Sequence, residues 1–249
     1  MVGIVGCGHV GGAMRELFSD AIVYDKYLGI GSEEEINKCD VAFVCVPTPM
    51  GADGRCDVSC VDEVLSWVNT DVIVIRSTVP IGYTKEKAER LNKRIVFQPE
   101  YYGETHNHPL ADLKKRTWIV LGGEIEDTSM VAKEYKKVYT AEIQIIKTDS
   151  ATAEMAKYME NAYLATKVIF CNEMFDIAQA YGIDYDELRE IWLMDPRINR
   201  SHTFVYEDDR GYGGSCFPKD MNALKKMAED KKVDCGLIAA TIEKNKKYR

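Results

Sequence analysis

The segment from Val2 to Gly11 restricts the fold of this chain more than any other. The β-branched run Val2–Val5 leads into Gly6-Cys7-Gly8-His9-Val10-Gly11, a G-x-G-x-x-G motif, and an amphipathic stretch to about Ser19 follows. In such a unit the first glycine permits a tight turn, the second lets the backbone approach a pyrophosphate, and the third packs helix on strand. The helix N-terminus then favours the phosphates through its N–H groups and dipole. We therefore predict a dinucleotide-binding site with cofactor contacts at Gly6, Gly8, His9, Val10 and Gly11.

Asp25 indicates which dinucleotide is bound. It follows the second predicted strand, Ala21–Tyr24, and lies nineteen residues beyond Gly6. An acidic residue at this place accepts hydrogen bonds from the adenosine ribose and repels a 2′-phosphate. The sequence therefore predicts NAD rather than NADP. A structural turn with a surface aspartate is the competing interpretation.

Short apolar runs alternate with helical patterns up to Thr148. Beyond the first two, we predict strands at Val41–Val46, Val72–Ile75, Ile95–Phe97, Trp118–Leu121 and Ile143–Ile146. This alternation is typical of a parallel, doubly wound α/β sheet, so residues 1–148 are expected to form a Rossmann-like domain.

The pattern changes after Thr148. Ala151–Tyr181 is apolar at helical spacing and contains no helix breaker, so we predict one long helix. Further helices are expected at Asp184–Trp192, at Lys219–Asp230 and from Asp234 onward. Residues 149–249 are therefore predicted to form an all-helical domain.

Composition excludes several classes of function. The formal net charge of −8 argues against binding nucleic acid or an anionic membrane through bulk charge. We expect no membrane span and no signal peptide, because no apolar run reaches about 18 residues and the N-terminus lacks a cationic start. The eight cysteines show no C-x-x-C spacing, so no metal site is expected. We expect reduced thiols and a cytoplasmic protein.

The segment Gly213-Gly214-Ser215-Cys216-Phe217-Pro218-Lys219-Asp220 carries the strongest catalytic signal. Glycines precede a cysteine that comes just before a predicted helix, with a cation within one turn. A helix N-terminus and a nearby cation both lower a thiol pKa, and the thiolate is the nucleophile. For the other seven cysteines we expect ordinary buried thiols.

Two further groups of polar residues are candidates. Glu100 and Glu104 follow a predicted strand, and loops at the carboxyl ends of strands bind ligands in such sheets. A surface loop is the alternative, chiefly for Glu104. Glu154, Lys157 and Asn161 share one face of the long helix, where the alternative is an ordinary solvated surface.

Taken together, these residues resemble the UDP-glucose/GDP-mannose 6-dehydrogenase family over nearly the whole chain. The matching segments, in this order, are Gly6–Gly11, Pro47-Thr48-Pro49, Ser77-Thr78-Val79-Pro80, Pro99-Glu100, the Lys157/Asn161 pair with Asn172-Glu173, Asp195-Pro196-Arg197-Ile198 and Gly211–Asp220.

The resemblance implies an NAD-dependent, four-electron oxidation of a nucleotide-sugar C6 alcohol to the carboxylate. Cys216 would hold the aldehyde as a thiohemiacetal and then a thioester. Glu100 would be the general base, Lys157 and Asn161 would stabilise the oxyanion, and Asp220 would orient water or assist proton transfer.

The resemblance also assigns binding residues and a partner. Cofactor contacts are implied at Pro47, Thr48, Ser77, Thr78 and Glu104, with Thr78 also near the nicotinamide and the reacting carbon. Substrate contacts are implied at Glu100, Tyr101, Tyr102, Lys157, Asn161, Arg197 and Gly213. Arg197 matches an arginine given to the partner subunit's site, which implies a homodimer built on the long helix.

The sequence departs from the family on the substrate side. Tyr101-Tyr102 replaces a common Phe-Leu, and Ser201–Arg210 is longer and more acidic than usual, so the sugar is left open. Family enzymes usually continue through a connecting helix into a third domain that completes the nucleotide-sugar site. This sequence reaches only the expected start of that helix, at Tyr248-Arg249, which suggests a short form, a fragment or one half of a split enzyme.

Two other functions compete with this one. A β-hydroxyacid-type alcohol dehydrogenase shares the layout and a lysine–asparagine pair but uses no catalytic cysteine. A catalytically idle NAD-binding partner protein is the second alternative. The joint presence of Glu100, Lys157, Asn161, Cys216 and Asp220 argues against it.

Overall fold

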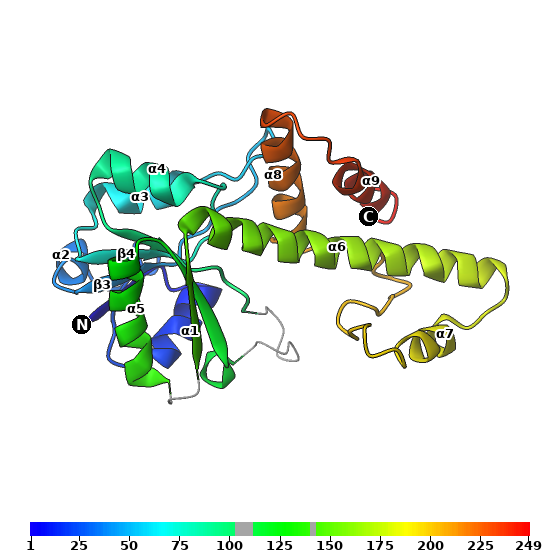
Figure 1. Ribbon diagram of the computed structural model, residues 1–249, viewed down its shortest axis with the longest axis horizontal. Helices are drawn as coiled ribbons and strands as arrows, with labels where there is room; N and C mark the ends of the chain where they lie inside the picture. The colour runs from blue at the N-terminus through cyan, green and yellow to red at the C-terminus, as the bar shows by residue number, and fades with distance from the viewer. Residues whose placement is uncertain (103–111, 140–142) are drawn as a thin grey trace. The chain divides into compact units, whose positions relative to one another are not determined.

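A computed structural model describes residues 1–102, 112–139 and 143–249 (Figure 1). These residues form two compact units, the first of residues 1–51 and 56–157 and the second of residues 52–55 and 158–249. The boundary expected at residue 148 falls nine residues before this division. The difference arises because the first two turns of the long helix pack within the first unit.

The first unit contains a seven-stranded sheet of order β2-β1-β3-β4-β5-β6-β7. Its strands are β1 Val2–Val5, β2 Ile22–Tyr24, β3 Val41–Val44, β4 Val72–Ile75, β5 Ile95–Phe97, β6 Trp118–Gly122 and β7 Gln144–Thr148. Five helices connect them: α1 His9–Leu17, α2 Glu33–Ile36, α3 Ser59–Trp67, α4 Tyr83–Leu91 and α5 Ile125–Val138. The predicted doubly wound α/β fold is confirmed.

The sheet departs from the expected parallel order at one place. Strands β1 to β5 are parallel, whereas β6 pairs antiparallel with β5, and β7 is parallel to β6. A parallel pair needs a crossover, usually a helix. Helix α5 supplies one between β6 and β7, but the described residues between β5 and β6 contain only a short 3-10 helix, Leu113–Lys115.

The central strands are buried along their whole length because helices cover both faces of the sheet (Figure 1). On one face, Ile4 and Phe43 belong to a core cluster with Met14 of α1 and Tyr135 of α5. On the other face, Val44 belongs to a cluster with residues of α2, α3 and α4.

Glu154 joins the long helix α6 (Ser150–Ala180) to this unit. The N–H groups of Gly82 and Thr84 donate to its two carboxylate oxygens, at 2.5 and 2.9 Å. The carboxylate thus caps the N-terminus of α4, whose N-cap residue Gly82 has no side chain of its own. Burial raises the pKa of Glu154. The interpretation of Glu154 as solvated surface is therefore wrong.

The second unit is all-helical, as predicted. It contains the rest of α6 with α7 (Tyr185–Trp192), α8 (Phe217–Asp230) and α9 (Gly236–Asn245). One core cluster joins α6 to α8 and α9 through Ala165, Met221 and Ile242. A second joins α6 to α7 through Cys171 and Tyr185.

Replacing Glu154 with alanine is expected to lower the free energy of unfolding by about 2–4 kcal/mol, because two buried N–H groups lose their acceptor and a cavity is left. Denaturant unfolding measures the change. Gln179→Ala is the matched control on the same helix. Its side chain is exposed, so the change should stay below about 0.5 kcal/mol. Equal stability of the two variants would contradict the capping role.

Candidate functional site

The carboxyl ends of β1, β3 and β4 lie side by side at one edge of the sheet. From β1 the chain goes to β2 on one side and then returns to β3 on the other. This reversal is the topological switch point, where open α/β sheets bind ligands.

The glycine motif lies at this switch point and has the geometry of a phosphate-binding turn. Gly6 has a φ of +88°, which favours glycine, and a Cβ on Gly11 would lie 1.8 Å from the Gly6 carbonyl oxygen. A Cβ on Gly8 would meet nothing within 4 Å. Gly6 and Gly11 are therefore required by the fold, whereas the space above Gly8 is open to a ligand.

The start of α1 and Asp25 complete the cradle. Gly8 is the N-cap residue of α1 and provides no side-chain cap, so the first turn can donate N–H groups to a pyrophosphate. One Asp25 oxygen accepts the Cys7 N–H at 2.8 Å, and the other accepts the N–H groups of Tyr27 and Leu28. The Cys7 N–H in particular lowers the pKa of Asp25. The ionised carboxylate fits a ribose diol and disfavours a 2′-phosphate.

The segments after β3 and β4 are tied together beside this cradle. The Ser77 hydroxyl donates to the Val46 carbonyl at 2.6 Å. The thiol of Cys56 lies 3.3 Å from the Thr78 carbonyl oxygen and 3.9 Å from that of Thr48. Pro47 immediately precedes Thr48. The four predicted cofactor contacts that follow β3 and β4, which are Pro47, Thr48, Ser77 and Thr78, therefore belong to one region of the first unit.

Glu100 follows β5 and is buried between two arginines. Its carboxylate forms ion pairs with Arg76, at the end of β4, and with Arg116, which precedes β6. It also accepts the Tyr102 N–H. Arg76 also donates to the Tyr135 hydroxyl, at 3.0 Å. Two cationic side chains therefore pair with the single carboxylate of Glu100 inside the unit.

Two tyrosines extend this group toward the glycine turn and the long helix. The ring of Tyr102 lies tilted against the ring of His9, with centroids 4.5 Å apart and an interplanar angle of 44°. The ammonium of Lys157 lies 5.1 Å from the ring centroid of Tyr101, at cation–π distance. Glu104, the other predicted carboxylate, lies outside the described residues.

The second unit carries the predicted nucleophile. Cys216 is exposed and is the N-cap residue of α8, with Pro218 in the first turn. The Ser215 hydroxyl lies 3.6 Å from its sulfur. All eight cysteines lie in the described residues and are free thiols, and the other seven are buried or half-buried.

Asn161 and Asp220 meet in the interior of the second unit. The Asn161 amide donates to one Asp220 oxygen at 2.5 Å, and Lys219 forms an ion pair with the other. All three side chains are buried. Lys219 therefore balances the charge of Asp220, a role that the sequence did not suggest.

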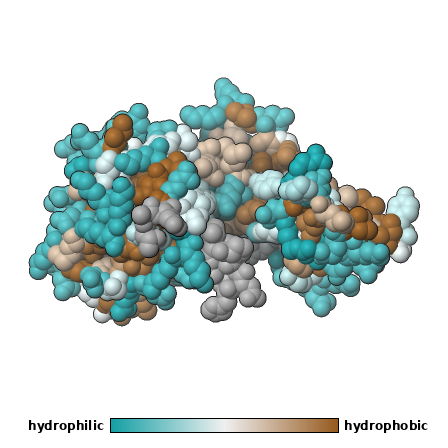
Figure 2. All heavy atoms as spheres, turned by 60° about the horizontal axis from the view of Figure 1, so that its bottom comes forward, coloured by the Kyte–Doolittle hydropathy of each residue, from teal (hydrophilic) through white to brown (hydrophobic). Residues whose placement is uncertain are grey.

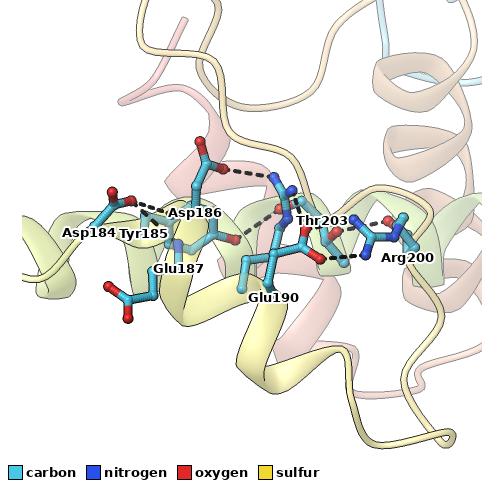
Figure 3. Close-up of polar contacts among 8 residues, drawn as sticks. Asp184, Tyr185, Asp186, Glu187, Glu190, Arg200 and Thr203 are labelled. Carbon is cyan, nitrogen blue, oxygen red and sulfur yellow. Dashed lines mark hydrogen bonds and ion pairs between the residues drawn. The ribbon is translucent and has the colours of Figure 1, made fainter.

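Arg197 and Gly213 also belong to this unit. Arg197 is exposed and pairs with Asp195. Its segment is held to α7 by two hydrogen bonds between Arg200 and Glu190, at 2.6 and 2.5 Å (Figure 3). A Cβ on Gly213 would lie 2.6 Å from the Arg249 guanidinium, which is the flexible end of a side chain.

The structure thus places the predicted residues in two groups. Gly6, Gly8, His9, Val10, Gly11, Asp25, Pro47, Thr48, Ser77, Thr78, Glu100, Tyr101, Tyr102 and Lys157 belong to the first unit, and Asn161, Arg197, Gly213, Cys216 and Asp220 to the second. Sequence reasoning missed Arg76 and Arg116. The position of Arg76 directly after the apolar run Val72–Ile75 could have indicated a buried arginine. A buried charge requires a partner, so a carboxylate near it could also have been expected.

The described residues contain no helix long and apolar enough to cross a bilayer. Over the same residues, no group of three or more His, Cys, Asp or Glu side chains is arranged to hold a metal.

Alanine substitutions in the glycine motif separate a cofactor cradle from a structural turn. Gly8→Ala should fold normally but bind NAD at least tenfold (about 1.4 kcal/mol) more weakly, because its methyl group occupies the pyrophosphate space. Gly11→Ala should also destabilise the unit. Gly12→Ala is the control, because its Cβ meets nothing and alanine favours a helix by up to about 1 kcal/mol. Calorimetric titration with NAD and thermal unfolding measure both effects. Unchanged NAD affinity in Gly8→Ala would contradict the cradle.

Comparison with curated proteins finds relatives that are longer than this chain. UDP-glucose 6-dehydrogenase of Rickettsia prowazekii is 33% identical over 234 residues, which are 89% of this chain and 52% of the relative. UDP-glucose 6-dehydrogenase TuaD of Bacillus subtilis is 32% identical over 227 residues, 86% of this chain and 48% of the relative. The chain spans about half the length of these relatives.

Two solved structures share the fold. A UDP-glucose dehydrogenase from Pyrobaculum islandicum has a TM-score of 0.87 at 24% identity, covering 99% of this chain and 68% of its own. A 3-hydroxyisobutyrate dehydrogenase from Mycobacterium tuberculosis has a TM-score of 0.75 at 15% identity, covering 99% of this chain and 92% of its own. At these identities both likenesses show the fold alone.

Family models identify both parts of the chain. The NAD-binding domain of the UDP-glucose/GDP-mannose dehydrogenase family matches residues 22–143, and the central domain of the same family matches residues 151–247. NAD is therefore the dinucleotide that suits the cradle around Gly8 and Asp25. The chain belongs to the UDP-glucose/GDP-mannose dehydrogenase family.

Proposed function

We propose that this chain carries the dinucleotide-binding and thiol-bearing parts of a nucleotide-sugar 6-dehydrogenase. The observation that carries the proposal is an exposed cysteine at the N-cap of α8, beside a buried Asn161–Asp220–Lys219 cluster, in a chain that also has a dinucleotide cradle. A UDP- or GDP-linked sugar is the proposed substrate, oxidised at C6 to the carboxylate.

Cys216 is the proposed nucleophile. NAD, when bound, would supply the hydride acceptor, one molecule for each of the two oxidations. In the first, the C6 alcohol loses a hydride to NAD and its hydroxyl proton to the general base. Between the two oxidations, the Cys216 sulfur forms a bond to the C6 aldehyde carbon, and the carbonyl oxygen takes up a proton, which gives a thiohemiacetal. Loss of the C6 hydride to a second NAD and of the hydroxyl proton to a base leaves a thioester, and water then breaks the C–S bond to release the carboxylate and the thiol. Exposure and the helix N-terminus both suit this role, because the thiolate is the reactive form.

Other residues are proposed to manage charge during these steps. The Lys157 ammonium and Asn161 amide can donate to the developing oxyanion. Asp220 orients water or assists proton transfer. Glu100 is the proposed general base, and its pairing with Arg76 and Arg116 favours the ionised form that a base requires. Thr78 lies at the end of β4, near the proposed nicotinamide position.

Several contacts complete the proposal. The cofactor is proposed to contact Pro47, Thr48, Ser77, Thr78 and Glu104, besides the glycine motif and Asp25. The substrate is proposed to contact Tyr101, Tyr102, Arg197 and Gly213, besides Glu100, Lys157 and Asn161. Reduced thiols suit the cytoplasm, where we propose that the protein works.

A homodimer built on α6 is also proposed. Spacings of four and seven residues place five exposed apolar side chains on one face of this helix: Met155, Met159, Tyr163, Phe170 and Ile177. Figure 2 shows apolar surface exposed on the helical unit, toward the right of the view. A continuous exposed apolar stripe of this kind is typical of a protein–protein interface.

Cys216→Ser tests the proposed chemistry. Wild-type protein with UDP-glucose, GDP-mannose or UDP-N-acetylmannosamine should yield two NADH per sugar, measured by absorbance. The serine variant should lose acid formation by at least ~10³-fold, because the nucleophile is gone. Cys235→Ser is the matched control, since Cys235 is the N-cap residue of α9 in the same unit.

Two results would overturn this chemistry. Full activity of the Cys216→Ser variant would favour a β-hydroxyacid-type alcohol dehydrogenase without a catalytic cysteine. Bound NAD without NADH formation from any of the three sugars would contradict the expected yield of two NADH per sugar.

Tyr163→Glu tests the dimer. A charge in the apolar stripe should weaken self-association by at least tenfold, because the carboxylate would lose its hydration in the interface. Sedimentation equilibrium measures the dimer dissociation constant. Gln179→Glu adds the same charge to α6 outside the stripe and should leave the constant unchanged. A wild-type monomer at micromolar concentration would refute the dimer.

A further inference from the structure

The loop that carries Cys216 is rich in glycine and must be held in place by other elements. Gly211 and Gly214 have φ values of +71° and +76°, in the left-handed region that favours glycine. Glycine has more backbone freedom to lose than any other residue, so such a loop does not fix a side chain by itself. The contacts that restrain it therefore determine where the sulfur lies.

Asn245, in the last turn of α9, makes a two-point contact with this loop. Its Oδ1 accepts the Tyr212 N–H at 2.8 Å, and its Nδ2 donates to the Tyr212 carbonyl at 3.0 Å. Asn245 and Tyr212 are both buried. The Tyr212 carbonyl also accepts from Arg249, at 3.3 Å. One side-chain amide thus satisfies both backbone groups of a residue four positions before the nucleophile.

The glycine at 211 and the asparagine at 245 fit each other sterically. A Cβ on Gly211 would lie 2.4 Å from Asn245 Oδ1, so any other residue would push the amide away. The Gly211 N–H itself donates to Asn172 of α6 at 3.2 Å. The Arg210 Nε–H donates to the same Asn172 Oδ1, at 2.6 Å, and so fixes the side chain of this asparagine. Side chains of α6 and α9 therefore hold two consecutive backbone positions.

Tyr212 transmits this restraint toward Cys216. Its buried ring makes an edge contact with Phe217, the first residue of α8, with centroids 6.2 Å apart at 79°. The Cys216 carbonyl accepts the Asp220 N–H at 2.9 Å and so starts α8. The loop is thus fixed on both sides of the cysteine.

We infer that Asn245 is a positioning residue for the Cys216 thiol, acting through the Tyr212 backbone. It holds the loop so that the sulfur stays at the N-terminus of α8, and it makes α9 a working part of the cysteine site. The inference rests on the proposed function for the role of Cys216, but the position of the thiol can be measured without any sugar substrate.

Alkylation of the full chain by iodoacetamide, followed by mass spectrometry of each cysteine peptide, measures that position. In Asn245→Ala, Cys216 should react two- to fivefold more slowly, about the size of a helix-terminus effect. Greater access cannot offset this loss, because the thiol is already exposed. Asn245→Asp keeps the side-chain volume and the acceptor but loses the donor to the Tyr212 carbonyl, so alkylation of Cys216 should also become slower. This variant therefore separates the effect of the hydrogen bond from the effect of packing.

Other cysteines report whether the unit remains folded. Cys171 is fully buried, and burial raises its pKa, so it should stay unreactive in both variants. Cys235, in the same unit, should react as in wild type. Thr241→Val is the control on α9. It removes a buried hydroxyl that donates to the Leu237 carbonyl of the same helix and lies 3.5 Å from the Thr166 hydroxyl of α6, and neither contact involves the loop.

Kinetics give an independent result. A displaced nucleophile should lower kcat by about 10²-fold, whereas the KM for NAD should not change because the cradle belongs to the first unit. Wild-type alkylation of Cys216 in Asn245→Ala would overturn the inference. A reactive Cys171 would also overturn it, because it would show that the unit has unfolded. A wild-type alkylation rate in Asn245→Asp would overturn it as well, because packing alone would then explain the effect of Asn245→Ala. If wild type forms no NADH, the proposed function fails, but the alkylation ratio still decides this inference.

Discussion

The NAD-binding cradle at the carboxyl end of β1 depends on the close approach of Gly11 to the carbonyl of Gly6. A Cβ at Gly11 would lie 1.8 Å from that oxygen, so α1 can begin directly after β1 only because both side chains are absent. That early start places the first turn of α1 at the switch point beside β3. It also brings the Cys7 N–H within 2.8 Å of Asp25, whose pKa it lowers. Steric exclusion at one contact thus determines where a helix begins, and an N–H group beside it favours the ionised form of a carboxylate.

Buried charged side chains have partners of opposite charge nearby in both units. Glu100 lies between Arg76 and Arg116 in the first unit, and Asp220 pairs with Lys219 and Asn161 in the second. A buried ion pair adds little net stability, because desolvation offsets the attraction, but removing one partner costs roughly 3–5 kcal/mol. Such groups therefore restrict side-chain orientation more than they stabilise the fold. This explains their concentration among the candidate site residues, where orientation matters most.

The sequence predicted local structure well and distant pairing poorly. Buried runs such as Val41–Val44 and the spacing of Gly6, Gly8 and Gly11 depend on neighbouring residues alone, so they could be recognised. Helical spacing placed Glu154 on a face of α6 but could not show that this face meets the N-terminus of α4. The same limit applies to Asn161 and Asp220, which are 59 residues apart. The direction of β6 depends on a connection without a regular crossover helix among its described residues, and no strand pattern encodes that.

Thiol selectivity shows why the loop before Cys216 is held by polar contacts. Burial raises the pKa of Cys45 to about 12 and also raises that of Cys171, so apolar packing makes a cysteine inert. Cys216 is instead exposed, and an exposed thiol gains little positional restraint from a core. The restraint must come from the backbone next to it, where hydrogen bonds to Tyr212 and Gly211 fix the chain without covering the sulfur. Glycine at position 211 is the condition for this arrangement, because a side chain there would displace the amide that provides the restraint.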